Sequence, residues 1–478
     1  MPVNYSIMLI GRDKEKAILQ EALDKEESQF IAVYGRRRVG KTFLIRESYG
    51  YQFYFQFTGA AHTSLKNQLT RFVFALQEQG LKDAPRQINS WLEAFSLLKQ
   101  LINQKDGGKK VIFLDELPWL DSPRSGFLSE LEVFWNGWAS ARKDIVLVVC
   151  GSATSWMVNK IIKNKGGLHN RLTQRIALKP FTLKHCKQLT ISNGVEFSQR
   201  QLLEAYMIFG GVPYYWSLLK KGASLAQEID RLIFSEDGDL YDEFSMLYAS
   251  LFKKPEPYIK VISLLSNKNY GMTRQELISA GGFDENGAFS DLLSDLEWCG
   301  FIRSYQNTGK RVKDAVYQLI DNYTVFYYSF VKNRRRSKNY WQSMQGKPEY
   351  NAWCGLAFER VCLWHTEQIK AKLGISGIVT TEYAWRNVAN NEISGAQIDL
   401  LIERGDGIID ICEIKFSVEE YSITKEYMEK LLHKKSVYKS VTKTRKAVHL
   451  VMITTFGLTK NAYFGEIQNE VVADDLFQ

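Results

Sequence analysis

The residues with the most specific chemistry lie near the start of the chain, where positions 35–42 read GRRRVGKT and fit the pattern GxxxxGK[ST]. The pattern follows an apolar run, FIAVY at 30–34, and precedes a helical pattern, as a phosphate-binding loop requires. Glycines let backbone N–H groups surround phosphates, the lysine reaches the β- and γ-phosphates, and the hydroxyl binds Mg²⁺. A plain glycine turn is the alternative. We expect ATP and Mg²⁺ to bind at Gly35, Arg36, Arg37, Arg38, Val39, Gly40, Lys41 and Thr42.

Two carboxylates, Asp115 and Glu116, follow a second apolar run, VIFL at 111–114. Nucleotide hydrolysis requires one acid near the metal and another group that orients the attacking water. We expect Asp115 to hold Mg²⁺ together with Thr42, and Glu116 to act on the water, with a solvated strand end as the alternative. A third apolar run leads to Ser152, whose hydroxyl we expect beside the γ-phosphate.

A second group of acids lies toward the other end of the chain, in two predicted strands at 397–402 and 408–416 that form a hairpin. The hairpin brings Asp399 on one strand close to Glu413 on the other. Lys415 shares a face with Glu413 because the side chains of a strand alternate. Asp399 and Glu413 can hold Mg²⁺ while Lys415 stabilises the charge of a transition state, which indicates phosphodiester hydrolysis.

The elements that position these residues belong to more than one domain. The chain has 478 residues, of which 45% are hydrophobic and 24% charged, values typical of soluble globular proteins. At about 150 residues per domain, this length predicts roughly three domains. No run approaches the roughly 18 apolar residues of a membrane-spanning helix, so we expect no membrane partner. The six cysteines lack any CxxC pair, which favours a reducing compartment, and we expect the cytoplasm.

The charge of the chain permits an anionic partner. Lys and Arg exceed Asp and Glu by 62 to 53, a net charge of +9. Basic residues concentrate in KNRRRSK at 332–338 and between 425 and 446, where lysines recur at helical spacing. Such runs are either solvated faces or contacts to a nucleic-acid backbone, and we expect DNA as a partner. The six histidines show no metal-binding spacing and predict no zinc site.

The pattern of apolar runs predicts an α/β multidomain fold. Short apolar strands separated by helices indicate a parallel sheet covered on both faces. Short helices followed by a hairpin predict a winged helix with its recognition helix at 291–296, a module that binds either DNA or proteins. The predicted domains are a nucleotide-binding core at 1–185, a helical lid at 186–250, a winged helix at 251–332, a basic linker at 333–350 and a last α/β domain at 351–478.

Several motifs in order resemble the prokaryotic STAND-type, AAA+-related ATPases first described mainly in archaea. They are GRDKE at 11–15, GRRRVGKT, LDELPWL, CGSATSW, GLHNRLTQRI and GGVPY at 210–214, and the resemblance covers about residues 9–250. It implies a P-loop ATPase with a helical lid, in which an arginine approaches the γ-phosphate. We assign this role to Arg171, with Arg175 as its rival and a surface arginine as the alternative. For the GGVP turn, nucleotide contact and a plain interhelical turn both stay open, as does homo-oligomerisation.

The second group of acids resembles the PD-(D/E)xK restriction-endonuclease and Holliday-resolvase superfamily over about 351–450. Glu359 on a helix, Asp399 on a strand and the following Glu413-Ile414-Lys415 fit its order, although Ile398 stands where the named motif has proline. The resemblance implies a restriction-endonuclease-like active site with Mg²⁺. We expect an ATP-regulated, Mg²⁺-dependent DNA nuclease. The alternative is a non-cleaving, DNA-binding regulatory ATPase, acting in defence or in a mobile element.

Overall fold

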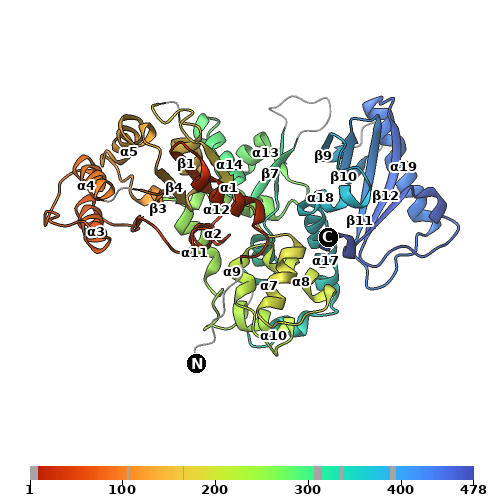
Figure 1. Cartoon of the computed structure of the whole chain (residues 1–478). Coiled ribbons are helices and arrows are strands. Elements are labelled where there is room, and N and C mark those ends of the chain that lie inside the picture. Colours follow the sequence, from red (N-terminus) through yellow and green to blue (C-terminus); the bar gives the residue numbers. More distant parts are fainter. Residues whose placement is uncertain (1–8, 105–106, 165, 306–314, 334–336, 388–394) are drawn as a thin grey trace. The chain divides into compact units, whose positions relative to one another are not determined.

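The structure is a computed structural model and describes residues 9–104, 107–164, 166–305, 315–333, 337–387 and 395–478. The chain forms two compact units, whose elements are labelled in Figure 1. The first comprises Met1–Pro180 and Ala249–Lys253, and the second comprises Phe181–Tyr248 and Lys254–Gln478. None of the helices in the described ranges is both long and apolar enough to cross a membrane.

The first unit is built on a five-stranded parallel sheet. β1, β3 and β4 are buried along nearly their whole length, as expected of strands covered on both faces. They are the three strands that the apolar runs predict. In spatial order the strands are β2 (Phe55–Thr58), β3 (Lys110–Asp115), β4 (Ile145–Gly151), β1 (Gln29–Tyr34) and β5 (Gln174–Ala177).

Helices cover both faces of this sheet. Consecutive residues of a strand point to opposite faces, so Ile31 joins the core beneath α1 and α2, and Phe30 joins the core beneath α3, α4 and α5. The helices are α1 (Asp13–Asp24), α2 (Lys41–Ser48), α3 (Leu65–Glu78), α4 (Trp91–Asn103), α5 (Phe127–Gly137) and the short α6 (Thr154–Trp156).

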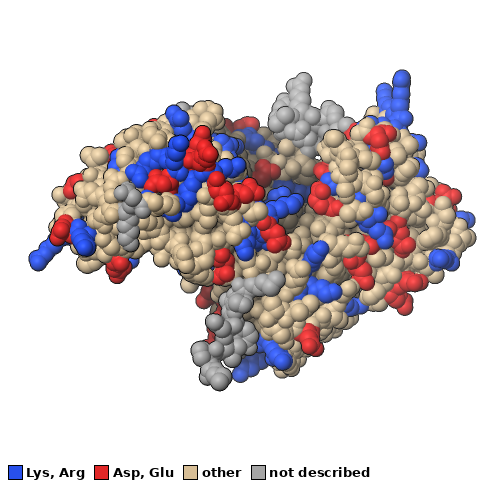
Figure 2. Space-filling view, in the orientation of Figure 1, with Lys and Arg blue, Asp and Glu red and all other residues tan. Residues whose placement is uncertain are grey.

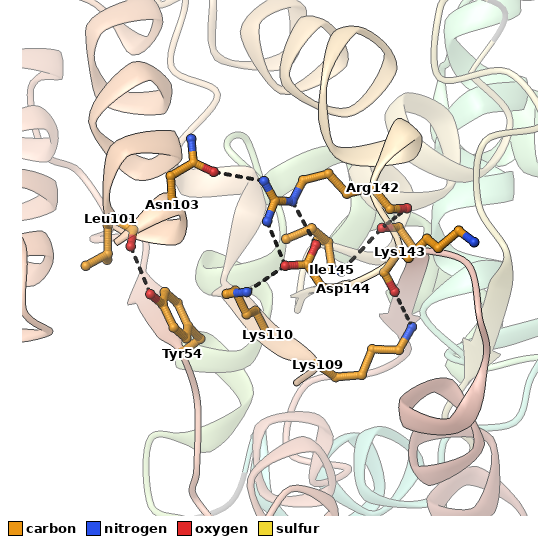
Figure 3. Close-up of polar contacts among 10 residues, drawn as sticks. Tyr54, Leu101, Asn103, Lys109, Lys110, Arg142, Lys143, Asp144 and Ile145 are labelled. Carbon is orange, nitrogen blue, oxygen red and sulfur yellow. Dashed lines mark hydrogen bonds and ion pairs between the residues drawn. The ribbon is translucent and has the colours of Figure 1, made fainter. Parts of the chain in front are cut away.

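A network of ion pairs joins the first residue of β3 to the residues just before β4 (Figure 3). Asp144 accepts hydrogen bonds from Nζ of Lys110 at 2.6 Å and from Nε and Nη2 of Arg142 at 2.7 Å each. The guanidinium of Arg142 also packs over the ring of Trp138, 4.7 Å from its centroid. Because parallel strands run in one direction, this network lies at the end of the sheet opposite to Asp115.

The second unit begins with a bundle of helices. Asn322 Nδ2 donates to the carbonyl oxygen of Tyr206 at 2.9 Å and so ties α15 to α8. Trp341 is fully buried and its amide donates to Asp230 at 2.7 Å, so this part of the segment assigned to a linker is packed; residues 334–336 of the basic run lie outside the described residues. The helices are α7 (Leu183–Ser192), α8 (Gln199–Phe209), α9 (Pro213–Ser217), α10 (Leu225–Ile229), α11 (Glu243–Leu251), α15 (Asn322–Phe326) and α16 (Tyr340–Met344).

A small three-stranded antiparallel sheet with three helices occupies residues 256–319. Thr273 and Glu276 form a capping box that fixes the start of α13. The hairpin expected from the sequence is present as β7 and β8. The elements in chain order are α12 (Glu256–Ser266), β6 (Met272–Thr273), α13 (Arg274–Gly281), α14 (Gly287–Trp298), β7 (Ile302–Tyr305) and β8 (Val316–Leu319).

The last part of the second unit is a mixed five-stranded sheet in the order β13-β12-β11-β10-β9. β9, β10 and β11 are antiparallel neighbours, and β12 and β13 continue the sheet in parallel. Apolar residues of α19 pack on one face, and α17 packs against β11. The elements are α17 (Pro348–Trp364), α18 (Thr366–Lys372), β9 (Thr380–Asn387), β10 (Ala396–Arg404), β11 (Ile408–Lys415), α19 (Lys425–Thr442), β12 (Ala447–Thr454) and β13 (Asn469–Val472).

Candidate nucleotide site and candidate acidic site

The expected phosphate loop connects β1 to α2 in a conformation that depends on glycine. Gly35 has a φ of 140° and Gly40, the residue before α2, a φ of 90°. A Cβ on Gly35 would lie 2.4 Å from the carbonyl oxygen of Leu178, so no larger residue fits there. Nζ of Lys41 donates to the carbonyl oxygens of Gly35 at 3.0 Å and Arg36 at 3.1 Å. The loop therefore surrounds the amino group assigned to phosphate binding.

Arg12 supports this loop from outside the motif. Its side chain is buried, and Nη2 donates to the carbonyl oxygen of Lys179 at 2.8 Å and to that of Val39 at 3.3 Å. These bonds tie the loop to the segment that follows β5. Sequence reasoning did not give Arg12 a role, although the GRDKE motif around it was the available signal.

Thr42 and Asp115 meet at the start of α2 and the end of β3. Oγ1 of Thr42 donates to Oδ2 of Asp115 at 3.0 Å, and burial raises the pKa of this aspartate. Hydroxyl and carboxylate oxygens are the ligands that suit Mg²⁺, so this donor set fits the ion. The thiol of Cys150 donates to Oδ1 of Asp115 at 2.6 Å. Sequence reasoning missed Cys150, because its position beside Asp115 depends on the pairing of β3 with β4.

Glu116 and Ser152 are hydrogen-bonded to each other in this structure. Ser152 Oγ donates to Oε1 of Glu116 at 2.6 Å, and the Ser152 N–H donates to Oε2 at 3.1 Å. The backbone of Glu116 is left-handed, with φ 49° and ψ 48°, which costs a residue other than glycine about 1 kcal/mol. Gly59 lies against this turn, since a Cβ there would be 2.7 Å from the Glu116 carbonyl oxygen. The two side chains assigned to water and to the γ-phosphate are thus direct neighbours.

The later motifs contain the two arginines considered for the γ-phosphate and the glycines of the GGVP turn. Arg171 lies exposed in the turn before β5, and Arg175 is exposed on β5 itself. The assignment of either arginine to the γ-phosphate stays a prediction. In the second unit, a Cβ on Gly211 would lie 1.8 Å from the carbonyl oxygen of Phe181. A tight interhelical turn therefore accounts for this glycine, and Pro213 begins α9.

The second group of acids lies where β10 and β11 pair. Their antiparallel register, continued by one residue, places Asp399 opposite Glu413. The pairing of β10 with β9 shifts between Ile398 and Leu401, so Asp399 lies on an irregular stretch of the strand. Such irregularities re-aim side chains and are frequent beside functional sites. The predicted hairpin is confirmed, and it brings the two acids together.

Both carboxylate oxygens of Glu413 have partners. Oε1 accepts a hydrogen bond from Tyr427 Oη at 2.6 Å and lies 3.2 Å from Nζ of Lys415, while Oε2 accepts from Nζ of Lys434 at 2.6 Å. Burial alone would raise the pKa of Glu413, but the two lysines hold it below its ordinary value. Sequence reasoning missed Tyr427 as a partner and gave Lys434 only a surface role. Their spacing of seven residues, which places them on one face of α19, was the available signal.

Glu359 joins the cluster from α17. Burial, followed by the negative charge of Asp399, raises the pKa of Glu359 to about 8. Burial, followed by the charge of Glu413, raises the pKa of Asp399 to about 6. The causes of these shifts mean that the three acids interact electrostatically. The structure therefore brings together Glu359, Asp399, Glu413 and Lys415, as expected from the sequence.

The arrangement of these acids does not fit a bound Mg²⁺ as it stands. Their carboxylate oxygens are suitable ligands in kind, but both oxygens of Glu413 already contact donors from Lys415, Tyr427 and Lys434. Within the described parts of the chain, no three His, Cys, Asp or Glu side chains form a group that could hold a metal ion. A cation at Glu413 would have to displace one of these donors.

The comparison with protein families identifies the first part of the chain. Residues 9–219 match the family described as "ATPase domain predominantly from Archaea". The chain therefore contains an archaeal-type ATPase domain. A relative named Uncharacterized protein MJECL04, from Methanocaldococcus jannaschii, is 26% identical over 361 residues, which are 74% of this chain and 76% of the relative. This similarity extends beyond the matched ATPase domain.

The chain has partial similarity to several solved structures. The Walker-type ATPase PABY2304 of Pyrococcus abyssi has a TM-score of 0.48 at 17% identity, covering 66% of this chain and 95% of its own. The ORC2 protein of Aeropyrum pernix has a TM-score of 0.40 at 12% identity, covering 74% and 95%. The Thermotoga maritima RuvB Holliday junction branch migration motor has a TM-score of 0.34 at 15% identity, covering 64% and 92%.

Proposed function

We propose that this protein is an ATP-hydrolysing switch that acts on DNA and cleaves phosphodiester bonds at the acidic cluster of its last domain. The observation that carries the cleavage is the convergence of Glu359, Asp399 and Glu413 with Lys415. Phosphodiester hydrolysis creates negative charge on the reacting phosphate, and Lys415 supplies a positive charge beside two buried acids. Burial raises the pKa of Glu359 and so favours its uncharged form beside these charges.

The nucleotide site supports the switch. In the ATPase domain, Lys41 would bind the phosphates and Thr42 and Asp115 would hold Mg²⁺, which neutralises charge on the transferred phosphate. Glu116 would orient the attacking water, for which it must leave its contacts with Ser152. The lid helices that follow the ATPase core in the chain would change conformation with the bound nucleotide and transmit that change to the later domains.

The distribution of charge supports a DNA contact in the last domain. α19 carries several lysines along its exposed side, and lysines on a helix can follow a phosphate backbone. The element order at 256–319 supports a winged helix. Its α14, the expected recognition helix, carries Asp291, Asp295 and Glu297 and no basic residue, and carboxylates there would repel phosphates. On the face shown in Figure 2, acidic and basic side chains are intermixed. We therefore assign the DNA contact to the last domain and a protein contact to α14.

The second candidate is a regulatory ATPase that binds DNA without cleaving it. Its supporting observation is that Glu413 is engaged by Lys434 and Tyr427, and that the cluster offers no ready three-ligand metal site in the described residues. Both candidates share the ATPase domain and the DNA contact. They differ in whether the acidic cluster performs chemistry.

The two candidates are distinguished by a cleavage assay on the full chain. Linear, supercoiled, single-stranded and branched DNA are incubated with Mg²⁺, with and without ATP, and the products are separated on a gel. We expect cleavage by the wild type and by Asp406→Ala, an acid in the exposed turn of the same hairpin, and none by Asp399→Ala. Equal cleavage by Asp399→Ala would place the activity elsewhere. Absence of cleavage on every substrate, with ATP hydrolysis intact, would favour the second candidate.

A further inference from the structure

A second lysine, on one face of α19, contacts the acidic cluster. Met428 and Leu431 pack into the core of the last domain, which fixes the rotation of the helix over the sheet. Lys434 follows one turn after Leu431 and reaches Glu413 with its Nζ at 2.6 Å from Oε2. The side chain of Glu413 is 4% exposed and that of Lys434 22%. The contact is therefore formed at the edge of the core, where water reaches the lysine more easily than the acid.

Two lysines already contact the carboxylate of Glu413. Nζ of Lys434 lies 2.6 Å from Oε2 and Nζ of Lys415 lies 3.2 Å from Oε1. A divalent cation at Glu413 would lie beside both ammonium groups, and like charges repel strongly in a partly buried site. One lysine must therefore leave Glu413 before a cation can bind there.

Lys434 has room to leave Glu413, while Lys415 is the lysine assigned to the reacting phosphate. Lys434 lines a cavity of about 530 Å³ between α19 and the start of β10, together with Lys430, His433 and Gln397. Gln397 precedes Asp399 by two residues, so the cavity adjoins the cluster. Rotation of the flexible lysine side chain can move its amino group from Glu413 into this cavity without any shift of the backbone.

We propose that the amino group of Lys434 occupies the cation position at Glu413. A divalent cation must displace this amino group in order to bind there. Lys434 is a positioning residue, because it acts through Glu413 and not on the reacting atoms. Lys434 thereby lowers the affinity of the cluster for the metal ion. This inference rests on the proposed function of the cluster and specifies what closes Glu413 to a cation.

The test is Mn²⁺ binding by isothermal titration calorimetry with the full chain and no nucleotide. Binding at the acidic cluster is the part of the signal lost in Asp399→Asn, which removes the contribution of the ATPase site. We expect Lys434→Met and Lys434→Gln to bind Mn²⁺ at least about tenfold more tightly than the wild type, because a hydrogen bond to a charged group contributes at least about 1.4 kcal/mol. Lys434→Arg keeps the positive charge and should bind like the wild type. Lys430→Met is the matched control, since it removes a lysine from the same helix and cavity.

Three other outcomes would overturn the inference. Equal Mn²⁺ affinity in wild type and Lys434→Met, with binding still lost in Asp399→Asn, would mean that Lys434 does not compete, while the proposed function would stand. Weaker binding by Lys434→Met and Lys434→Gln would mean that this lysine supports the ion. Absence of any Asp399-dependent binding in every variant would remove both the inference and a metal-dependent function of the cluster.

Discussion

The ion-pair network at the start of β3 and β4 makes a quantitative prediction for Asp144→Ala (Figure 3). This substitution leaves Lys110, whose side chain is 2% exposed, without its carboxylate partner. Removal of one partner from a buried pair typically costs 3–5 kcal/mol. The side chain of Asp144 is 24% exposed, so water can partly replace it, and we expect a loss of about 3 kcal/mol in the free energy of unfolding of the first unit.

Thermal unfolding measures this loss. For a unit of this length, each kcal/mol shifts the melting temperature by about 2–4 °C, so Asp144→Ala should lower it by roughly 6–12 °C. The relevant transition is the one that ATP shifts upward in the wild type and not in Lys41→Ala, because a ligand stabilises the domain that binds it. Hydrogen bonds from Arg142 and Lys110 also hold the pKa of Asp144 well below its ordinary value.

A double-mutant cycle isolates the pair. Lys110→Met replaces the buried charge with an apolar side chain of similar length, while Asp144 keeps its hydrogen bonds from Arg142. In that background Asp144→Ala should cost only about 1 kcal/mol, the remaining contacts with Arg142 being partly exposed. The same decrease in melting temperature in both backgrounds, or a decrease below about 2 °C in the wild-type background, would refute the reasoning.

Two further predictions concern the nucleotide site and acid stability. Lys41→Ala should abolish ATP binding, and Glu116→Gln should retain it while lowering hydrolysis about 10²- to 10⁴-fold, measured by calorimetry and phosphate release; hydrolysis at the wild-type rate would remove Glu116 from this role. His365 is fully buried and accepts a hydrogen bond from the amide of Leu183, and burial lowers its pKa to about 4. Because the folded state favours neutral histidine, the free energy of unfolding should fall by up to about 3 kcal/mol as pH drops from 6.5 to 4. The free energy of unfolding, measured by urea denaturation, should depend less on pH in His365→Gln than in the wild type. An unchanged pH dependence would mean that His365 does not cause the loss of stability.

The central strands of the first sheet could be predicted from the sequence because they are buried on both faces. β1, β3 and β4 are continuous apolar runs, a pattern that only a covered strand or a buried helix explains. β2 alternates buried and exposed residues over four positions, and β5 has only one buried residue. Four residues with one buried face cannot be distinguished from a loop, so the two edge strands were not predicted.

Site residues were predictable where one element determines their position. The loop at 35–42 and the pair Asp115-Glu116 depend on the end of one strand, and Asp399 and Glu413 depend on one hairpin. Lys434 could not be placed on Glu413, because that contact depends on the rotation of α19 over the sheet. Likewise, the contact of Ser152 with Glu116 requires the order of strands, in which β4 lies next to β3.

Regulation of the acidic cluster by ATP requires a coupling free energy between sites in different units, and linkage makes that coupling testable without cleavage. If ATP changes the Mn²⁺ affinity of the cluster by some factor, Mn²⁺ at the cluster must change ATP affinity by the same factor, typically about 5- to 150-fold. Glu116→Gln prevents turnover during the titrations, and Glu116→Gln with Asp399→Asn reports the effect of Mn²⁺ at the nucleotide site alone. We expect equal factors in the two directions, lost in the double variant. Independent affinities would mean that ATP hydrolysis does not control the cluster, and the switch would then have to act on the DNA contact instead.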